Sequence, residues 1–339
     1  MKKVLYIVAL FAISFIGKAQ NHYDFSAVCE TGQILYYAIT NEKNHEVKVT
    51  CPGHIIYPEP DYGPIGGYIG YEMPTGNLVI PSSFEHYGET YTVTAIDTCA
   101  FSSCDALTQV TIPNTVTDIY YYAFRNTGIE GNLVIPQSVI SIQDKAFCNC
   151  SGITGLALPN SIQIIGDYTF AKCVNITELV IPNSVQHIGE RAFYGCNNIL
   201  QLVFPNSINL IGESAFSTCN KLQSIIFNNP NTHSESTETI IGNGAFLDCQ
   251  NLSSVEFSNS ITKLDDSSFK GCKNLISVSI PDSTIEIGSC TFMNCENLTS
   301  ITIGNGINII KASAFSNCSN LTYVSIGKSI KEIGPSAFS

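Results

Sequence analysis

The chain has 339 residues, of which 44% are hydrophobic and only 13% charged, and its formal net charge is −12 at pH 7. A composition this apolar argues against intrinsic disorder. An acidic chain without a basic run is a poor partner for nucleic acid or for an anionic membrane surface. The length suits either two ordinary domains or one elongated array.

Residues 1–19 carry the pattern of a secretory signal peptide. Two lysines near the start precede an apolar run from Val4 to Ile16, and Gly17 and Ala19 come before the expected cleavage site after Ala19. The apolar run is short for a membrane span, although an uncleaved anchor helix is the alternative. We therefore expect a secreted or cell-surface protein with no membrane segment after cleavage. Its mature charge would be −15, because three lysines are lost with the signal.

Residues 20–75 are rich in tyrosine and glycine and follow no period. The stretches ILYYAIT and EVKVT within them are strand-like, which predicts a small β-rich N-terminal cap. Cys29 and Cys51 lie beside these stretches, so a local disulfide is one possibility there. The glycine-rich stretch GPIGGYIG, residues 63–70, is interpreted as a flexible junction.

A 23-residue period runs through residues 76–339. It is most visible in a phenylalanine that recurs every 23 residues, apart from one step of 30, at Phe101, Phe124, Phe147, Phe170, Phe193, Phe216, Phe246, Phe269, Phe292, Phe315 and Phe338. The seven extra residues fall within NNPNTHSESTET, a polar stretch that fits an inserted surface loop. The period predicts a solenoid of about eleven units, the last of them incomplete.

The consensus of the unit is L-x-x-V-x-I-P-x-S-V-x-x-I-G-x-x-A-F-x-x-C-x-N. The spacing of Ile301 and Ile303 places both on one face of a strand, while Leu298 enters from the preceding turn. A proline or another turn former ends this strand, and a second short extended segment follows, such as Val185 to Ile188. The Ala-Phe pair is then expected to direct its ring inward from a single helical or 3₁₀ turn. One unit buries too little apolar surface to fold alone, so the units must stack.

A cysteine follows the repeat phenylalanine by three residues in most units, and Thr127 breaks this column. The column consists of Cys104, Cys150, Cys173, Cys196, Cys219, Cys249, Cys272, Cys295 and Cys318. No histidine is repeated beside it, which argues against a nucleophile, and no C-x-x-C pair indicates a metal site. We interpret the column as a reduced interior row, and His187 as a solvent-facing repeat residue.

The units LVIPNSVQHIGERAFYGCNNI and LISVSIPDSTIEIGSCTFMNCENL resemble the 23-residue leucine-rich repeats of the BspA-type family, also known from a treponemal surface protein. The resemblance extends over residues 76–339. It implies a bacterial leucine-rich-repeat solenoid, mostly β within the α/β class, with a parallel sheet along one side and right-handed winding. It further implies a surface or secreted location and adhesion to host matrix proteins or other cells. The family shares no ligand motif, so no ligand residue carries over.

The outward positions of the predicted strands are free to vary between units. One residue before the last inward isoleucine, successive units read Thr111, Val134, Ala157, Val180, Val203, Ile226, Glu256, Ser279, Thr302 and Ser325. Stacked about 5 Å apart, the five apolar residues of this series would form a stripe about 20 Å long. We predict a partner-binding face made of Val134, Ala157, Val180, Val203 and Ile226 with the flanking Glu178 and Gln201. The alternative is that valine and isoleucine occur here for strand propensity alone.

These patterns predict a protein that binds protein ligands and uses no cofactor, with a structural spacer of a larger surface protein as the alternative. An enzyme would need a cluster of acidic residues and histidines outside the repeat. The cap alone has any density of these, at His22, Asp24, His45, Glu46, His54, Glu59 and Asp61. They alternate with turn residues and suggest no catalytic geometry.

Overall fold

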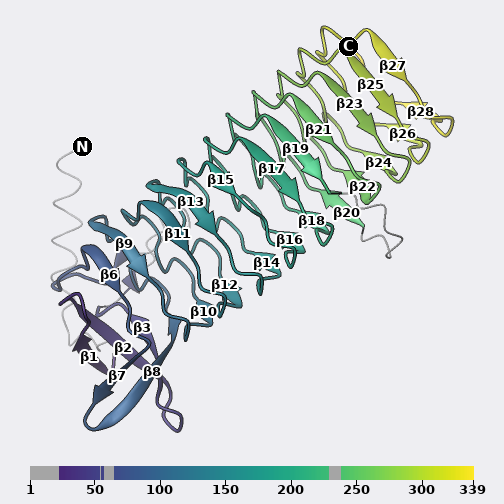
Figure 1. The fold of residues 1–339 in the computed structure, drawn as a ribbon. Helices are drawn as coiled ribbons and strands as arrows, with labels where there is room; N and C mark the ends of the chain where they lie inside the picture. The colour runs from purple at the N-terminus through teal and green to yellow at the C-terminus, as the bar shows by residue number, and fades with distance from the viewer. Residues whose placement is uncertain (1–22, 54, 57–64, 229–237) are drawn as a thin grey trace, which may run out of the picture.

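The computed structural model describes residues 23–53, 55–56, 65–228 and 238–339. The predicted signal peptide and most of the predicted loop lie outside the described residues. The described chain winds into an elongated stack of coils built from strands and turns (Figure 1), which confirms the mostly-β parallel solenoid. We name each coil by its repeat phenylalanine. Within the described ranges, no helix long and apolar enough to cross a membrane is found.

Each coil contributes one strand to a first parallel ladder, which runs along one side of the stack (Figure 1). Its strands are β6 (Gly76–Val79), β9 (Leu107–Thr111), β11 (Gly131–Val134), β13 (Ile153–Ala157), β15 (Glu178–Leu179), β17 (Gln201–Phe204), β19 (Ser224–Phe227), β21 (Ser254–Glu256), β23 (Ser277–Ile280), β25 (Ser300–Ile303) and β27 (Tyr323–Ser325). Side chains alternate as predicted. In β17, Leu202 and Phe204 are buried whereas Gln201 and Val203 are exposed.

A second parallel ladder is formed by the short segment that follows the proline-type turn. Its strands are β8 (Glu89–Ile96), β10 (Asp118–Ile119), β12 (Ser141–Ile142), β14 (Ile164–Ile165), β16 (His187–Ile188), β18 (Leu210–Ile211), β20 (Thr239–Ile241), β22 (Ile261–Leu264), β24 (Glu286–Ile287), β26 (Ile309–Ile310) and β28 (Glu332–Ile333). Ile188 pairs with Ile211, 23 positions later, and Ile211 pairs with Ile241 across the longer unit. The register therefore survives the insertion.

The third side of each coil is a run of overlapping turns. We predicted a helical or 3₁₀ turn here, and that prediction is wrong for the described coils. In the coil of Phe170, Tyr168 and Lys172 have φ angles of 55° and 61°, in the left-handed region. This alternation directs every second N–H along the axis: Tyr168 N and Phe170 N donate to carbonyls of the next coil at 2.8 Å, and Lys172 N does so at 2.7 Å. A helix would keep these donors within its own coil.

The repeat phenylalanines form one continuous stack through the interior. Neighbouring ring centroids are 5.1–5.5 Å apart and the ring planes lie within 4–17° of each other. Each ring up to Phe315 is fully buried, whereas Phe338 in the last coil is 39% exposed. Stacking thus buries each inner ring between the rings of both neighbours. The two end rings differ: Phe101 is buried at the cap end, whereas Phe338 stays partly exposed.

The cysteine column lies beside the rings, and all fourteen cysteines of the chain are free thiols. Cys196 Sγ donates to the carbonyl oxygen of Phe170 at 3.2 Å, and the other column thiols from Cys150 onward repeat this bond to the preceding coil. Thr127 Oγ1 instead donates to Phe124 O of its own coil at 2.9 Å, and it lies 3.2 Å from Cys150 Sγ. Burial raises the pKa of the Cys249 thiol to about 12. The predicted reduced interior column is confirmed.

The N-terminal cap continues the second ladder. Strands β1 (Phe25–Val28), β2 (Ile34–Asn41) and β3 (Glu46–Thr50) are antiparallel, and β3 then pairs in parallel with β8. A hairpin of β7 (Ser83–His86) and β8 accounts for the stretched first unit. Two further short strands, β4 (Ile55–Ile56) and β5 (Ile65–Gly66), pair with each other. The cap strands therefore share one seven-stranded sheet with β10 and β12, the first short strands of the second ladder.

The structure decides between the alternatives for the cap cysteines and corrects the expectation for the glycine-rich stretch. Cys29 and Cys51 are both buried and unbridged, and Cys29 Sγ lies 3.0 Å from Thr31 Oγ1. The described part of the glycine-rich segment is anchored, because Tyr68 is buried and its hydroxyl donates to Ala100 O at 2.8 Å. That segment is therefore not a free junction: Tyr68 packs against the coil of Phe101.

The phenylalanine stack predicts a difference between an inner and an end position. Phe193→Ala should lower the free energy of unfolding by about 3–5 kcal/mol, because a fully buried ring leaves a cavity. Phe338→Ala should cost less than about 1.5 kcal/mol, because that ring is already partly in water. Urea unfolding followed by circular dichroism measures both. Equal losses at the two positions would contradict the stacking account.

The cysteines predict a labelling order. In native buffer at pH 8, a thiol reagent should first modify Cys148 and Cys290, which are half-buried, while the buried column reacts only after unfolding. Peptide mass spectrometry after timed labelling identifies the sites. Labelling of Cys196 or Cys249 as fast as Cys148 would show that the column is not interior.

Candidate functional site

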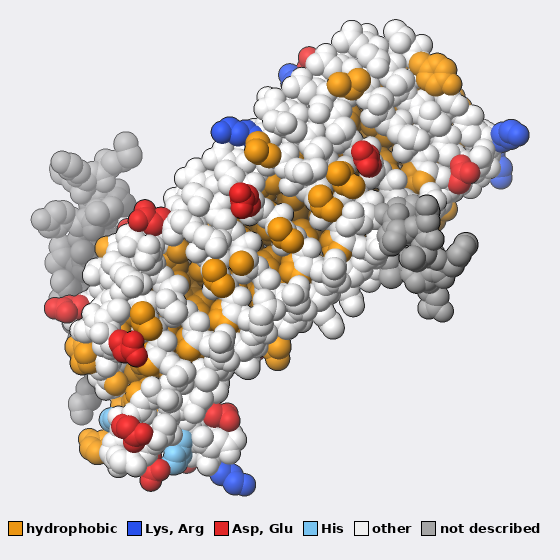
Figure 2. All heavy atoms as spheres, viewed as in Figure 1, with side chains coloured by type: hydrophobic (Ala, Val, Ile, Leu, Met, Phe, Trp, Pro, Cys, Tyr) orange, Lys and Arg blue, Asp and Glu red, His pale blue; other side chains and the backbone are white. Residues whose placement is uncertain are grey.

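The predicted partner-binding residues lie on the outward side of the first ladder. Val134 is 58% exposed and Val180 75% exposed, and Val203 and Ala157 are also exposed, while Ile226 is half-buried. Val134 is the register partner of Ala157, and Val203 is that of Ile226. On the face shown in Figure 2, hydrophobic side chains gather in a stripe along the long axis, and Lys and Arg side chains lie at its margins.

The stripe has one discontinuity that the sequence does not predict. Strand β15 pairs with β13 and β17 pairs with β19, but β15 and β17 belong to different sheets. The break falls between Val180 and Val203. The flanking Glu178 and Gln201 are both exposed, one on each side of the break. The apolar side chains therefore sit on two abutting sheets.

The stripe ends sharply toward the C-terminus. Ile226 is paired in register with Glu256, which is exposed. The same outward position then holds Ser279 and Thr302, both exposed. The two halves of one ladder thus present different chemistry at the same repeat position.

A second row of apolar side chains lies on the outward side of the second ladder. Ile164 is 56% exposed and Leu210 37% exposed, and His187 stands between them in register. Leu210 in turn pairs with Ile240. The outward position of the first ladder does not predict this row. In the sequence, the row is found at the residue directly before the inward isoleucine of the second extended segment. His187 is exposed, as predicted.

The described residues assemble no recognisable catalytic or metal site. Among them, no three His, Cys, Asp or Glu side chains come together in a way that could hold a metal ion. In the cap, Asp24 Oδ2 accepts a hydrogen bond from Ile39 N at 2.7 Å, and His45 faces Glu89 at 3.5 Å. Both contacts tie neighbouring strands together. His22, His54, Glu59 and Asp61 lie outside the described residues.

The chain was compared with known families, proteins and structures. The family model of the BspA type leucine rich repeat region matches residues 81–152, 130–237 and 230–339. No curated protein sequence matches the chain.

Several solved structures are similar to this chain, and the first of them shares its fold. A leucine-rich repeat protein from Bacteroides ovatus is 25% identical, with a TM-score of 0.53, over 94% of this chain and 80% of that one. A leucine rich cell surface protein from Faecalibacterium prausnitzii is 24% identical, with a TM-score of 0.41, over 89% and 94%. The pneumococcal vaccine antigen PcpA is 18% identical, with a TM-score of 0.42, over 93% and 89%.

The family match covers more than half of the chain, and the coils repeat with the period of that family. On this evidence the chain belongs to the BspA-type leucine-rich repeat family.

Proposed function

We propose that this protein is an exported bacterial surface protein that binds protein partners through the apolar stripe of its first ladder. The observation that carries the proposal is the exposure of Val134, Val180 and Val203 at one outward position of the repeat. Exposed, contiguous apolar side chains commonly mark a protein interaction site. An extended face of this kind is also the surface that solenoid proteins use for binding.

Strand propensity alone is a weaker account of the stripe. The outward position of β23 and β25 holds Ser279 and Thr302, and these strands pair over four register positions, as β17 and β19 do. Strand formation in this fold therefore does not require valine or isoleucine at that position. The occurrence of valine or isoleucine in four of five successive coils, with Ala157 in the fifth, favours a binding role.

The partner is expected to bury these side chains under an apolar surface of its own. Glu178 and Gln201 flank the stripe and would supply the polar rim that protein interfaces have. The apolar row of Ile164 and Leu210 on the second ladder would extend the contact over the same coils. Export rests on the signal pattern of residues 1–19, and adhesion to host matrix or cell-surface proteins is the role most consistent with it.

The double substitution Val180→Asp with Val203→Asp tests the stripe. We expect at least tenfold weaker capture of proteins from extracellular-matrix extract, because two charges would have to be desolvated in the interface. The melting temperature should stay nearly unchanged, since both side chains already face water. Quantified pull-down with the full-length mature protein is the measurement.

A matched control uses the same repeat position in the polar half. Ser279→Asp with Thr302→Asp adds the same two charges to the same ladder, and capture should remain at the wild-type level. If the Val180 and Val203 variant captured matrix proteins as well as wild type, the proposed binding face would be wrong.

A further inference from the structure

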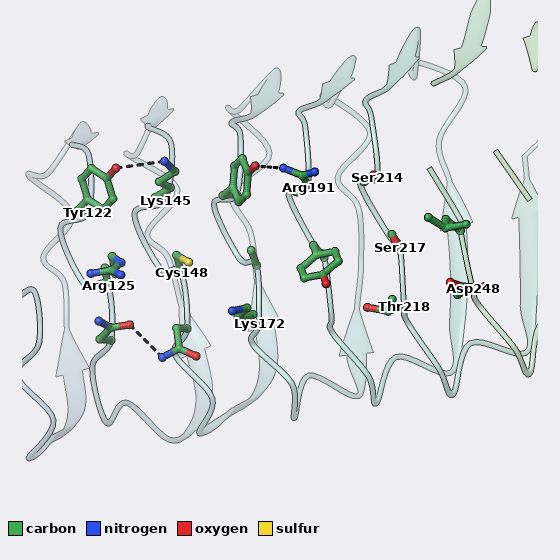
Figure 3. A pocket seen from close by; sticks show the side chains of 16 residues that line it. Tyr122, Arg125, Lys145, Cys148, Lys172, Arg191, Ser214, Ser217, Thr218 and Asp248 are labelled. Carbon is green, nitrogen blue, oxygen red and sulfur yellow. Dashed lines mark hydrogen bonds between the residues drawn. The ribbon is translucent and has the colours of Figure 1, made fainter. Parts of the chain in front are cut away.

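A groove of about 680 Å³ lies on the turn side of the solenoid, away from the outward faces of both ladders (Figure 3). It extends from the coil of Phe124 to that of Phe246. Both arginines of the whole sequence, Arg125 and Arg191, line it together with Lys145 and Lys172. In a chain with a net charge of −12, this is a local concentration of positive charge.

The cations are spaced by the repeat. Four successive coils supply one each, in the order Arg125, Lys145, Lys172 and Arg191. The phenylalanine rings of these coils are 5.1–5.5 Å apart. The groove therefore offers one positive charge per coil, in staggered positions: Lys145 and Arg191 lie in one row, and Arg125 and Lys172 lie to one side of that row (Figure 3).

One row of the groove stands out within the repeat itself. Two residues before the repeat phenylalanine, the chain adopts the left-handed conformation in every coil, and most coils have a small residue there. The full row is Cys99, Tyr122, Lys145, Tyr168, Arg191, Ser214, Gly244, Ser267, Cys290, Ser313 and Ser336. A left-handed φ costs a non-glycine residue about 1–2 kcal/mol. Large side chains nevertheless occupy this position in four successive coils, and those are the four coils that supply the cations of the groove.

These four side chains hold one another in place. Lys145 Nζ lies 5.4 Å from the ring centroid of Tyr122 and 5.1 Å from that of Tyr168, and it donates to the Tyr122 hydroxyl at 3.2 Å. Arg191 lies 5.4 Å from the same Tyr168 ring, donates to its hydroxyl and pairs with Glu190 at 3.0 Å. Contacts of this kind fix the charges before a ligand arrives, which reduces the entropy that binding must overcome.

The other end of the groove has a different lining. Ser214, Thr218 and Asp248 face it there, without a cation among the lining residues of those coils. Asn126 and Asn149 line the cationic end and form an amide hydrogen bond of 3.0 Å with each other. Hydroxyl and amide groups thus accompany the charges, and Ala171 and Leu247 are the aliphatic lining residues.

We propose that this groove binds a short acidic oligosaccharide. Its carboxylate or sulfate groups would lie on Arg125, Lys145 and Lys172, and its hydroxyls would bond to the amide and hydroxyl side chains. A nucleic acid fits less well, because its charge is uniform whereas the cations stop at Arg191 and Asp248 follows.

Isothermal titration of the full-length mature protein with a heparin-derived tetrasaccharide and with tetragalacturonate tests the proposal. The wild type should bind at least one of them, and Arg125→Gln with Lys172→Gln should weaken that binding at least tenfold. Lys328→Gln with Lys331→Gln makes the same charge change on exposed lysines at the far end of the solenoid and should leave binding unchanged. Matching melting temperatures of the two variants would establish that both are folded.

A second readout uses the groove cysteine. Cys148 lines the groove, whereas Cys290 does not. The bound saccharide should slow thiol labelling of Cys148 and leave that of Cys290 unchanged. If neither saccharide bound, if binding survived in the groove variant, or if single-stranded DNA of equal charge bound more tightly, the assignment would be overturned. The Val180→Asp and Val203→Asp variant should keep its saccharide binding. The proposal for the stripe and the proposal for the groove can therefore be refuted independently.

Discussion

The structure depends on contact between each coil and the next. A single 23-residue coil has one phenylalanine, one cysteine and a few aliphatic residues to bury, which is too little to offset the entropy of ordering it. Three sets of main-chain hydrogen bonds join neighbouring coils, two in the ladders and one along the turn side. The Phe193 ring packs between Phe170 and Phe216, and the Cys196 thiol bonds to the coil before it. The stability of the fold therefore comes from contacts between neighbouring coils, and a single coil is not stable alone.

This dependence constrains the interior and leaves the outside free. An inward residue must match the same residue one coil away, so Ile188 pairs with Ile211 and Leu202 with Ile225. An outward residue meets only solvent and its register partner, so Ile226 can stand beside Glu256. Residues on the outer surface can therefore vary, and can form binding sites, without disturbing the stacked interior. The apolar stripe and the cationic groove lie on largely the same coils but on different sides of the solenoid. Two ligands of different chemistry could therefore bind at the same time.

On the turn side of the solenoid, the backbone of each coil adopts a strained, left-handed conformation. The left-handed backbone there is required by the hydrogen bonds to the next coil, and glycine would adopt it most easily, as at Gly244. Tyr168 and Arg191 occupy the same position with large side chains. Strain retained where smaller residues would suffice commonly coincides with a functional site. In the described coils, the left-handed position with large side chains is also the position where tyrosine rings and cations alternate from coil to coil.

The sequence by itself determined the period, the two extended segments, the inward phenylalanine and cysteine columns and the outward position of Val134 and Val180. These follow from side-chain alternation and spacing, which are local properties of a strand. The tertiary structure alone decided the conformation of the turn side, the break between β15 and β17 and the existence of the groove. The sign of φ at Tyr168 depends on a carbonyl in the next coil, and Arg125 and Lys172, 47 residues apart in the chain, line one groove only because their coils stack. The repeat pattern predicts that coils stack, but it does not specify which atoms of neighbouring coils come into contact.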